Sequence, residues 1–150
     1  MIDPKVEKIL RVVLEQTAKV VDIDRFYVAL YNPVTVKLDF PLAVRKVKGE
    51  LTRMKSGSGR WKSRPYQPDV RLPDFIFTKG QQGILVAADF EGWMTARGLK
   101  YETHPLSWLG VPLGVPQVAR GRAIGAIVVE HYTQESAYDE GTYDILRAIA

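Results

Sequence analysis

The histidine and cysteine content of this chain leaves little room for metal or thiol chemistry. His104 and His131 are the only histidines among 150 residues, and no HExxH or similar paired spacing accompanies them. The chain contains no cysteine, which removes disulfides, thiolate nucleophiles, zinc ribbons and iron–sulfur clusters. We therefore expect no metal site and a structural role for both histidines.

Two short patterns resemble catalytic motifs but lack essential parts. Gly57-Ser58-Gly59 has neither the Gly-Lys-Ser/Thr ending of a P-loop nor the glycine offset of a nucleophile elbow, which indicates a flexible loop. Asp139-Glu140 precedes a predicted helix, where acidic side chains favour the helix dipole, so we interpret the pair as capping. The sequence therefore predicts no catalytic residue.

A group of aromatic residues is better suited to binding a ligand. Tyrosine and tryptophan combine apolar area with a polar atom that can orient a ligand, although we expect roughly half of this group to be core residues. The group comprises Tyr27, Tyr31, Phe90, Trp93, Tyr101 and Trp108.

The length and amino-acid composition are those of an ordinary globular protein. Hydrophobic residues make up 46% of the chain and charged residues 25%, and its length suits one domain. The longest uncharged runs, such as residues 106–119, are interrupted by proline and glycine, and residues 1–8 are too charged for a secretion signal. We expect a cytoplasmic protein without a membrane span.

The positive charge is concentrated in one segment. Residues 45–72 carry nine lysines and arginines against two acidic residues, while the whole chain has a net charge of +4. A solvated surface loop and an attractive patch for an acidic partner or phosphate both fit this charge. We do not expect nucleic-acid binding, which would require salt-dependent affinity with several released counterions.

The N-terminal third predicts a helix followed by a hairpin. Asp3-Pro4 places a capping residue before a proline, and apolar residues then recur at helical spacing over residues 4–21. Residues 26–31 are aromatic and β-branched, and residues 37–48 alternate, which predicts two strands around a turn at Asn32-Pro33. Pro41 suggests an edge or a bulge in the second strand.

The remaining sequence predicts a long loop and then regular elements. The thin apolar pattern of residues 49–82 indicates a surface loop, with a short helix over 72–79 ended by Gly80. The further predicted elements are a strand at 84–88, a helix at 91–97 ended by Gly98, strands at 108–115 and 122–131 around a turn at 117–121, and a helix over 139–150. Because the last helix is still running at Ala150, we expect residues 1–150 to be a single domain excised from a longer protein.

This order of elements predicts an α+β domain with one antiparallel sheet covered on both faces. The segments Ser107-Trp108-Leu109-Gly110-Val111-Pro112-Leu113, 121–129 and Tyr143-Asp144-Ile145-Leu146 closely resemble the end of many bacterial GAF domains. Residues 24–31 resemble that family's first strand, and residues 78–80 with 84–89 its mid-domain turn and strand.

The resemblance implies a sheet of about five to six strands, with N- and C-terminal helices on one face and short helices and loops over the other. It also implies a ligand-sensing regulatory domain of a signalling protein such as a sensor histidine kinase or nucleotide cyclase, often dimeric, with a small-molecule pocket on one sheet face. A ligand-free dimerisation or scaffold module is the alternative, and thermal shift against metabolites distinguishes the two.

Several specialisations of the family do not fit this chain. Its only asparagine, Asn32, lies in the first hairpin turn, whereas the cyclic-nucleotide signature begins with an asparagine at long spacing from its other residues. Without cysteine, neither a covalent bilin nor methionine-sulfoxide reductase chemistry is expected. We expect a binding domain and no enzyme, and the identity of any ligand or cofactor stays unknown.

Strand alternation locates a candidate pocket. In the first strand Tyr27 and Tyr31 share one face and the aliphatic residues share the other, and in the later strand Glu130 falls on the tyrosine face. A buried carboxylate requires a partner, for which Arg97 is the nearest candidate in the family's layout. The predicted ligand site has a floor of Tyr27, Tyr31, Trp108 and Glu130 and a roof of Trp93 and Arg97.

This site would suit a small, partly aromatic or amine-bearing metabolite. The alternative is that Glu130 lies at the exposed end of its strand and that the aromatic residues fill the space. The many apolar positions of the first helix, including adjacent pairs at 9/10, 13/14 and 20/21, further predict a parallel or near-parallel homodimer through the first and last helices.

Overall fold

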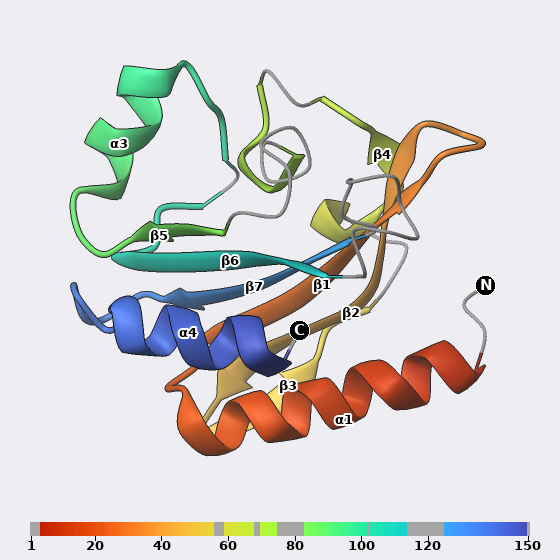
Figure 1. Ribbon diagram of the computed structural model, residues 1–150, viewed down its shortest axis with the longest axis horizontal. Helices are drawn as coiled ribbons and strands as arrows, with labels where there is room; N and C mark the ends of the chain where they lie inside the picture. Colours follow the sequence, from red (N-terminus) through yellow and green to blue (C-terminus); the bar gives the residue numbers. More distant parts are fainter. Residues whose placement is uncertain are drawn as a thin grey trace.

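The computed structural model describes residues 4–55, 59–67, 70–74, 83–101, 103–113 and 125–149. Its centre is an antiparallel sheet with the strand order β3-β2-β1-β7-β6-β5, and β4 pairs with β2 beside this path (Figure 1). The strands are β1 (Arg25–Asn32), β2 (Lys37–Val47), β3 (Glu50–Arg53), β4 (Arg64–Pro65), β5 (Ile84–Val86), β6 (Ser107–Leu113) and β7 (Gly125–His131). The helices are α1 (Pro4–Val20), α3 (Phe90–Arg97), α4 (Glu140–Ile149) and the 3₁₀ helix η1 (Gly59–Trp61).

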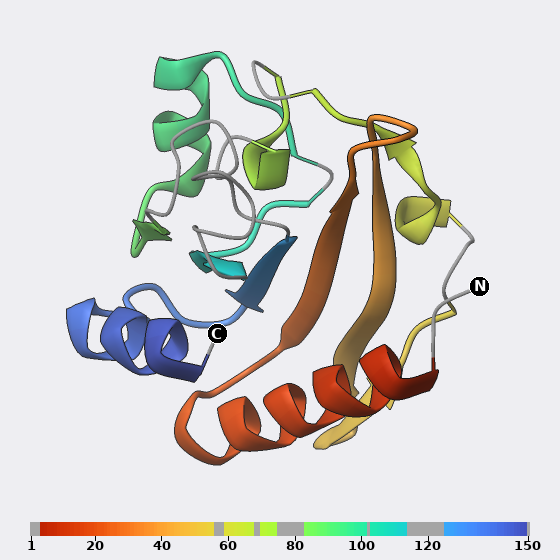
Figure 2. The ribbon, with the colours of Figure 1, turned by 45° about the vertical axis from the view of Figure 1, so that its right-hand side comes forward.

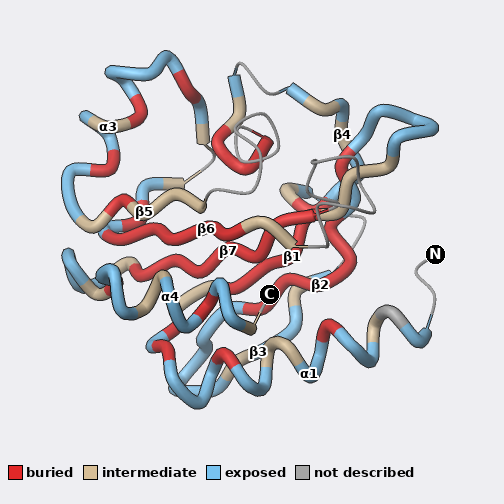
Figure 3. The backbone as a smooth tube through the Cα atoms, viewed as in Figure 1, coloured by how far each residue is buried: buried red, intermediate tan, exposed pale blue. Residues whose placement is uncertain are grey.

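Strand β1 joins the two halves of the chain. It pairs with β2, which follows it directly, and on its other side with β7, where Arg25 opposes Glu130 and Leu30 opposes Gly125. The central strands are buried on both sides: β7 is buried along its whole length, β6 at Ser107–Val111 and β1 at Phe26–Ala29, as the red segments show (Figure 3). This arrangement confirms the predicted α+β fold with one antiparallel sheet.

The two faces of the sheet carry separate apolar clusters. Phe26 and Val28 of β1 pack with Ile127 of β7 beneath α1 and α4, and Leu10 and Leu146 of these helices belong to the same cluster. Tyr27, Ala29, Trp108 and Val128 face the other way, toward α3 and η1. The alternation predicted from the sequence is confirmed, and Figure 2 shows α1 and α4 on one side of the sheet with α3 on the other.

The helix ends follow the predicted capping. Asp139 accepts a hydrogen bond from the backbone N–H of Thr142 (2.9 Å), which lowers the pKa of its carboxyl group and caps α4. Gly98 ends α3 in the left-handed conformation (φ 65°), as the sequence predicted. Helix α1 ends at Val20, where the N–H of Val21 still bonds to Thr17.

Pro41 marks an irregularity in β2. Val28 pairs with Leu42 and Leu30 with Asp39, so one residue of β1 opposes two residues of β2 at this point. The extra residue is a β-bulge, which the proline predicted.

The prediction that most of residues 49–82 form a surface loop is wrong in the parts that the structure describes. Glu50–Arg53 forms β3 after a two-residue turn, Lys48-Gly49, in which both residues have positive φ. Beyond it lie η1 and β4, and the segment is then held by buried Asp74, whose carboxylate takes two hydrogen bonds from Arg64 (2.7 and 2.8 Å). These elements form by pairing with the edge of β2 and by burying Trp61, which a single-segment pattern does not reveal.

The other predicted ends of helices and strands agree with the structure within a few residues, where the structure describes them. Residues 72–74 are helical, and residues 75–80 of the predicted helix lie outside the described residues, as do the 117–121 turn and residues 57–58. The strand predicted at 84–88 ends at Val86, and the strand predicted from residue 122 is described from Gly125.

Candidate functional site

The carboxylate of Glu130 is the centre of a polar cluster inside the sheet face that carries Tyr27. Glu130 is fully buried on β7. Its Oε2 accepts a hydrogen bond from the Tyr101 hydroxyl and lies 3.4 Å from Nη2 of Arg60, while its Oε1 accepts one from the Tyr132 hydroxyl (2.9 Å). The cost of burying the charge is thus offset by three donors, one of them cationic.

Arg60 reaches Glu130 from η1 and is enclosed by aromatic rings. Its guanidinium carbon lies 4.7 Å from the ring centre of Trp61, 4.9 Å from that of Tyr101 and 5.3 Å from that of Tyr27. Only 14% of the Arg60 side chain is exposed. Ring faces carry negative potential, so this enclosure stabilises the guanidinium charge away from water.

Tyr101 and Tyr132 stay protonated and donate hydrogen bonds to Glu130. Burial raises the pKa of Tyr101 well above its ordinary value, and the neighbouring Glu130 charge raises it further. Burial and the same carboxylate raise the pKa of Tyr132 to about 12. Tyr101 also hydrogen bonds with Tyr27 through their hydroxyls (2.7 Å), so the phenols form a chain that ends on the carboxylate.

The structure brings together three of the six predicted ligand residues. Tyr27 and Glu130 lie in this cluster, and Trp108 is directly opposite Glu130 on β6, with its ring edge-on to Tyr101. Tyr31 lies further along β1, where its ring packs on Tyr66 (5.1 Å).

The two predicted roof residues lie together on α3. Trp93 packs against the apolar cluster on this face of the sheet, and Arg97 is exposed, with its guanidinium 4.0 Å from the Trp93 ring centre. The expected pairing of Arg97 with Glu130 is wrong, because Arg97 points back along its own helix and Arg60 takes that place.

Sequence reasoning missed Arg60, Trp61 and Tyr132. Arg60-Trp61 lies in the basic segment that we interpreted as a surface loop, and its insertion depends on how η1 packs. Alternation along β7 and beyond could have suggested Tyr132, which is two residues after Glu130.

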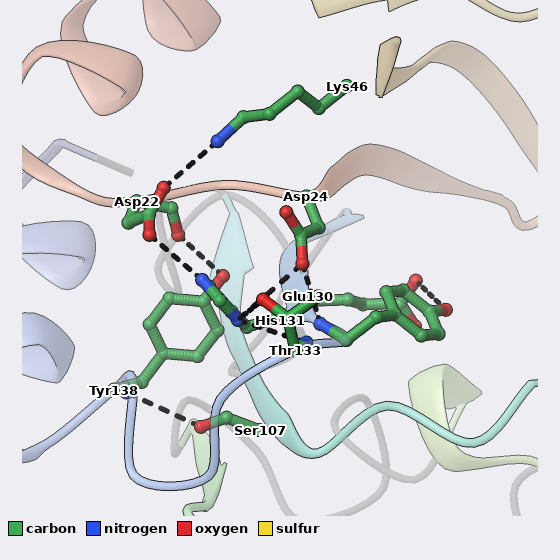
Figure 4. A network of polar contacts seen from close by, with 9 residues as sticks. Asp22, Asp24, Lys46, Ser107, Glu130, His131, Thr133 and Tyr138 are labelled. Atoms are coloured by element: carbon green, nitrogen blue, oxygen red, sulfur yellow. Dashed lines mark hydrogen bonds and ion pairs between the residues drawn. The ribbon is translucent and has the colours of Figure 1, made fainter. Parts of the chain in front are cut away.

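A second polar network lies on the opposite side of the same strand end (Figure 4). Nε2 of buried His131 is 2.8 Å from Asp22, and Nδ1 is 3.5 Å from Asp24. The Tyr138 hydroxyl donates to the backbone oxygen of Asp22 (2.8 Å). The network therefore joins the segment after α1 to the segment before α4.

The acidic and histidine side chains and the lengths of the helices bear on the kind of site present. Within the described residues, no group of three or more His, Asp or Glu side chains is placed to hold a metal ion. None of the helices described here has the length and apolar character needed to cross a membrane.

Comparison with known proteins gives a consistent match. The family model for the GAF domain matches residues 5–150. Residues 122 to 287 of a methyl-accepting chemotaxis protein superpose with a TM-score of 0.71 at 18% identity, covering 96% of this chain and 83% of that one. The GAF domain/HD domain protein from Geobacter sulfurreducens gives a TM-score of 0.63 at 16% identity, covering 96% and 86%.

A further similar structure is the GAF domain from Acinetobacter phosphoenolpyruvate-protein phosphotransferase. Its TM-score is 0.58 at 15% identity, and the match covers 99% of this chain and 89% of that one. At these identities the structural likeness establishes the fold alone. No curated protein sequence matches.

Proposed function

Because this chain belongs to the GAF domain family, a family of sensory and regulatory domains, we propose that it senses a small molecule within a longer signalling protein. The ligand would bind on the sheet face that carries Tyr27 and Glu130, beneath α3. Residues 1–150 would form one such domain of a cytoplasmic protein whose output is a histidine kinase or nucleotide cyclase domain.

The observation that carries this proposal is the buried Glu130 cluster. Ligand sites are mostly apolar and contain a few converging polar groups, which is the composition of the Glu130, Tyr27 and Tyr101 region. Within the described part of the chain, the buried Nε1 of Trp108 has no hydrogen-bond acceptor. A buried donor of this kind is costly unless something accepts from it, and a bound ligand would supply an acceptor.

A neighbouring cavity supports access to this region. A space of about 310 Å³ lies between α3 and the segment after it, within the range of small-molecule sites. Phe90, Met94 and Leu99 form its apolar part, and Tyr101 borders it. Tyr101 therefore stands between the cavity and Glu130, and Trp93 with Arg97 would cover the region from α3.

The signal would leave the site through the end of β7. Glu130 faces the proposed ligand, and the next residue, His131, contacts Asp22 on the helix side of the sheet. A ligand that repositions Glu130 would therefore bias a network whose other members flank α1 and α4. These helices would carry the change to the attached output domain.

We also propose that two copies associate in parallel through these helices. Ile9, Val12 and Val20 of α1 are exposed, as is Ile145 of α4. Helices α1 and α4 contact each other, so these side chains lie on one helical layer.

Thermal shift against a metabolite library tests the ligand proposal. We expect at least one compound to raise the Tm of the wild-type domain by mass action and to lose this effect with Tyr101→Phe, which removes the hydroxyl between Tyr27 and Glu130. Asp39→Asn, on the exposed part of β2, is the matched control and should respond like the wild type.

A ligand-free dimerisation or scaffold module is the second candidate function. It is favoured by Arg60, which already neutralises Glu130 without any ligand. Under this alternative, no compound raises the Tm of the wild-type domain, and the ligand proposal fails.

A further inference from the structure

Arg60 occupies a position that has the features of a binding site for an organic cation. Its guanidinium contacts the rings of Tyr27, Trp61 and Tyr101 at centroid distances of 5.3, 4.7 and 4.9 Å. The Glu130 carboxylate, 3.4 Å from Nη2, closes the inner end of this enclosure. Aromatic faces around a cation, with a buried carboxylate as counter-charge, are the chemistry by which proteins recognise such ligands.

The walls of the enclosure also have contacts that do not involve Arg60. Tyr27 lies in the central strand β1 and Glu130 in β7, and these two strands are paired. Trp61 is buried, with its ring 5.0 Å from Tyr27 and 5.7 Å from Phe40. Tyr101 is held by Tyr27 and by Glu130 through its hydroxyl.

Arg60 itself is less deeply buried than Tyr27, Trp61 and Glu130. It belongs to the three-residue helix η1, and 14% of its side chain is exposed, whereas Glu130 is fully buried. Its long aliphatic stem allows the guanidinium to swing outward while Trp61 stays in the core. The guanidinium can therefore return to water without breaking a strand pair.

We propose that this enclosure is a binding site for a small guanidinium-bearing ligand, and that Arg60 is an internal occupant which this ligand displaces. The inference rests on the proposed sensing function and names the ligand class of the same site. Displacement exchanges one guanidinium for another, so the Glu130 charge stays compensated in both states. The difference between the two states is the position of the Arg60 side chain.

The first arm of the test empties the site. Arg60→Ala removes the occupant and leaves Glu130 without its cationic partner, so the variant should have a lower Tm than the wild type. Low-millimolar methylguanidinium chloride should raise the Tm of Arg60→Ala back toward the wild-type value. Potassium chloride at equal ionic strength should not. Methylurea, which has a similar shape and no charge, should not raise this Tm either.

The second arm asks whether a ligand displaces Arg60 from the wild-type domain. Methylguanidinium should bind the wild type about tenfold more weakly than Arg60→Ala, because in the wild type it must first displace the Arg60 side chain from the site. As it binds, the NMR signal of the Arg60 side-chain N–H should move to its solvent-exposed position. The double variant with Tyr101→Leu, which removes the aromatic ring of one wall, should bind methylguanidinium more weakly than Arg60→Ala alone.

Three results would overturn the inference. The first is that methylurea raises the Tm of Arg60→Ala as much as methylguanidinium does. The second is that methylguanidinium does not bind to Arg60→Ala. The third is that methylguanidinium saturates the wild type while the NMR signal of the Arg60 side chain stays where it was. If a neutral or anionic library compound stabilises the wild type through Tyr101, the sensing function stands and the cation inference fails. If methylguanidinium behaves as expected while no library compound binds, the cation site stands and the sensing function fails.

Discussion

Asp22 links the segment after α1 to both β7 and β2. Its carboxylate lies 2.8 Å from Nε2 of His131 and 3.1 Å from Nζ of Lys46. The hydrogen bond from His131 and, to a smaller extent, the hydrogen bond from Lys46 hold the pKa of Asp22 below its ordinary value of 3.8. Burial has a smaller, opposing effect on this pKa. Asp24 and the Tyr138 hydroxyl also contact this network.

This depressed pKa predicts a specific loss of stability in acid. A carboxyl group whose pKa is lower in the folded state stabilises the fold above its unfolded pKa, and that contribution disappears as the pH falls through the folded value. The wild-type domain should therefore exceed Asp22→Asn in free energy of unfolding at pH 5 to 6, and the difference should shrink below about pH 4.

Urea denaturation followed by tryptophan fluorescence across this pH range measures the difference. Asp39→Asn, an exposed carboxylate on β2, serves as the control for a general change in charge. If the difference in free energy of unfolding between the wild type and Asp22→Asn stayed constant from pH 6 to pH 3, the prediction would be contradicted.

At this scale the sequence predicts where a side chain points better than what it touches. Alternation placed Glu130 on the same face as Tyr27, and both lie there in the structure. The partner of Glu130 was predicted as Arg97 and is Arg60, because the position of η1 is set by its packing on Tyr27 and Phe40 and leaves no periodic pattern in the sequence.

At the scale of elements, the contact between β1 and β7 depends on a glycine. Gly125 begins β7 opposite Leu30 of β1 and Leu113 of β6. A Cβ atom at this position would stand 2.6 Å from the backbone oxygen of Ala29 and 2.8 Å from a methyl carbon of Leu30. Since one of these atoms is backbone, the strand itself would have to move.

Gly125→Ala should therefore destabilise the domain by about 1 to 3 kcal/mol, the usual cost of overpacking a filled core. Equilibrium urea unfolding provides the measurement. Gly141→Ala is the control, because Gly141 is exposed in α4 and an added Cβ there meets only the Asp139 carboxylate, at 3.3 Å. An unchanged midpoint for Gly125→Ala would show that β1 and β7 are not held as closely as described.

Elements with a local signal were predicted, and those that depend on a partner strand were not. Asp139 predicted the start of a helix and Gly98 the end of another. In the structure, Asp139 caps the start of α4 and Gly98 ends α3. Strand β3 contains four residues with little apolar pattern, so its existence follows from pairing with β2. Its one local signal is the Lys48-Gly49 turn, in which both residues have positive φ.

At the scale of the whole molecule, the helical layer is the surface on which we expect two copies to meet. Ile9→Glu would place a charge among exposed apolar side chains of α1, where Ile9 itself is 62% exposed. Burying that charge at an interface without a partner is costly, so the variant should be monomeric where the wild type is dimeric.

Sedimentation velocity over a range of protein concentrations measures this difference, and circular dichroism verifies that the variant is folded. Val34→Glu is the matched control, because Val34 is 89% exposed in the turn between β1 and β2, away from the helices, and should leave the dimer intact. A wild-type domain that stays monomeric at high concentration, or an Ile9→Glu variant that still dimerises, would refute helix-mediated pairing.

The pairing of β1 with β7 also determines the order in which the domain can be completed during synthesis. Arg25 pairs with Glu130, roughly one hundred residues later in the chain. At typical translation rates that interval lasts roughly 5 to 20 s. Throughout it, β1, β2 and β3 can form a hairpin meander, but one edge of β1 keeps unpaired backbone groups and both of its faces carry apolar side chains such as Phe26 and Tyr27. We therefore expect the nascent chain to be most prone to misassociation in the seconds before β7 leaves the ribosome.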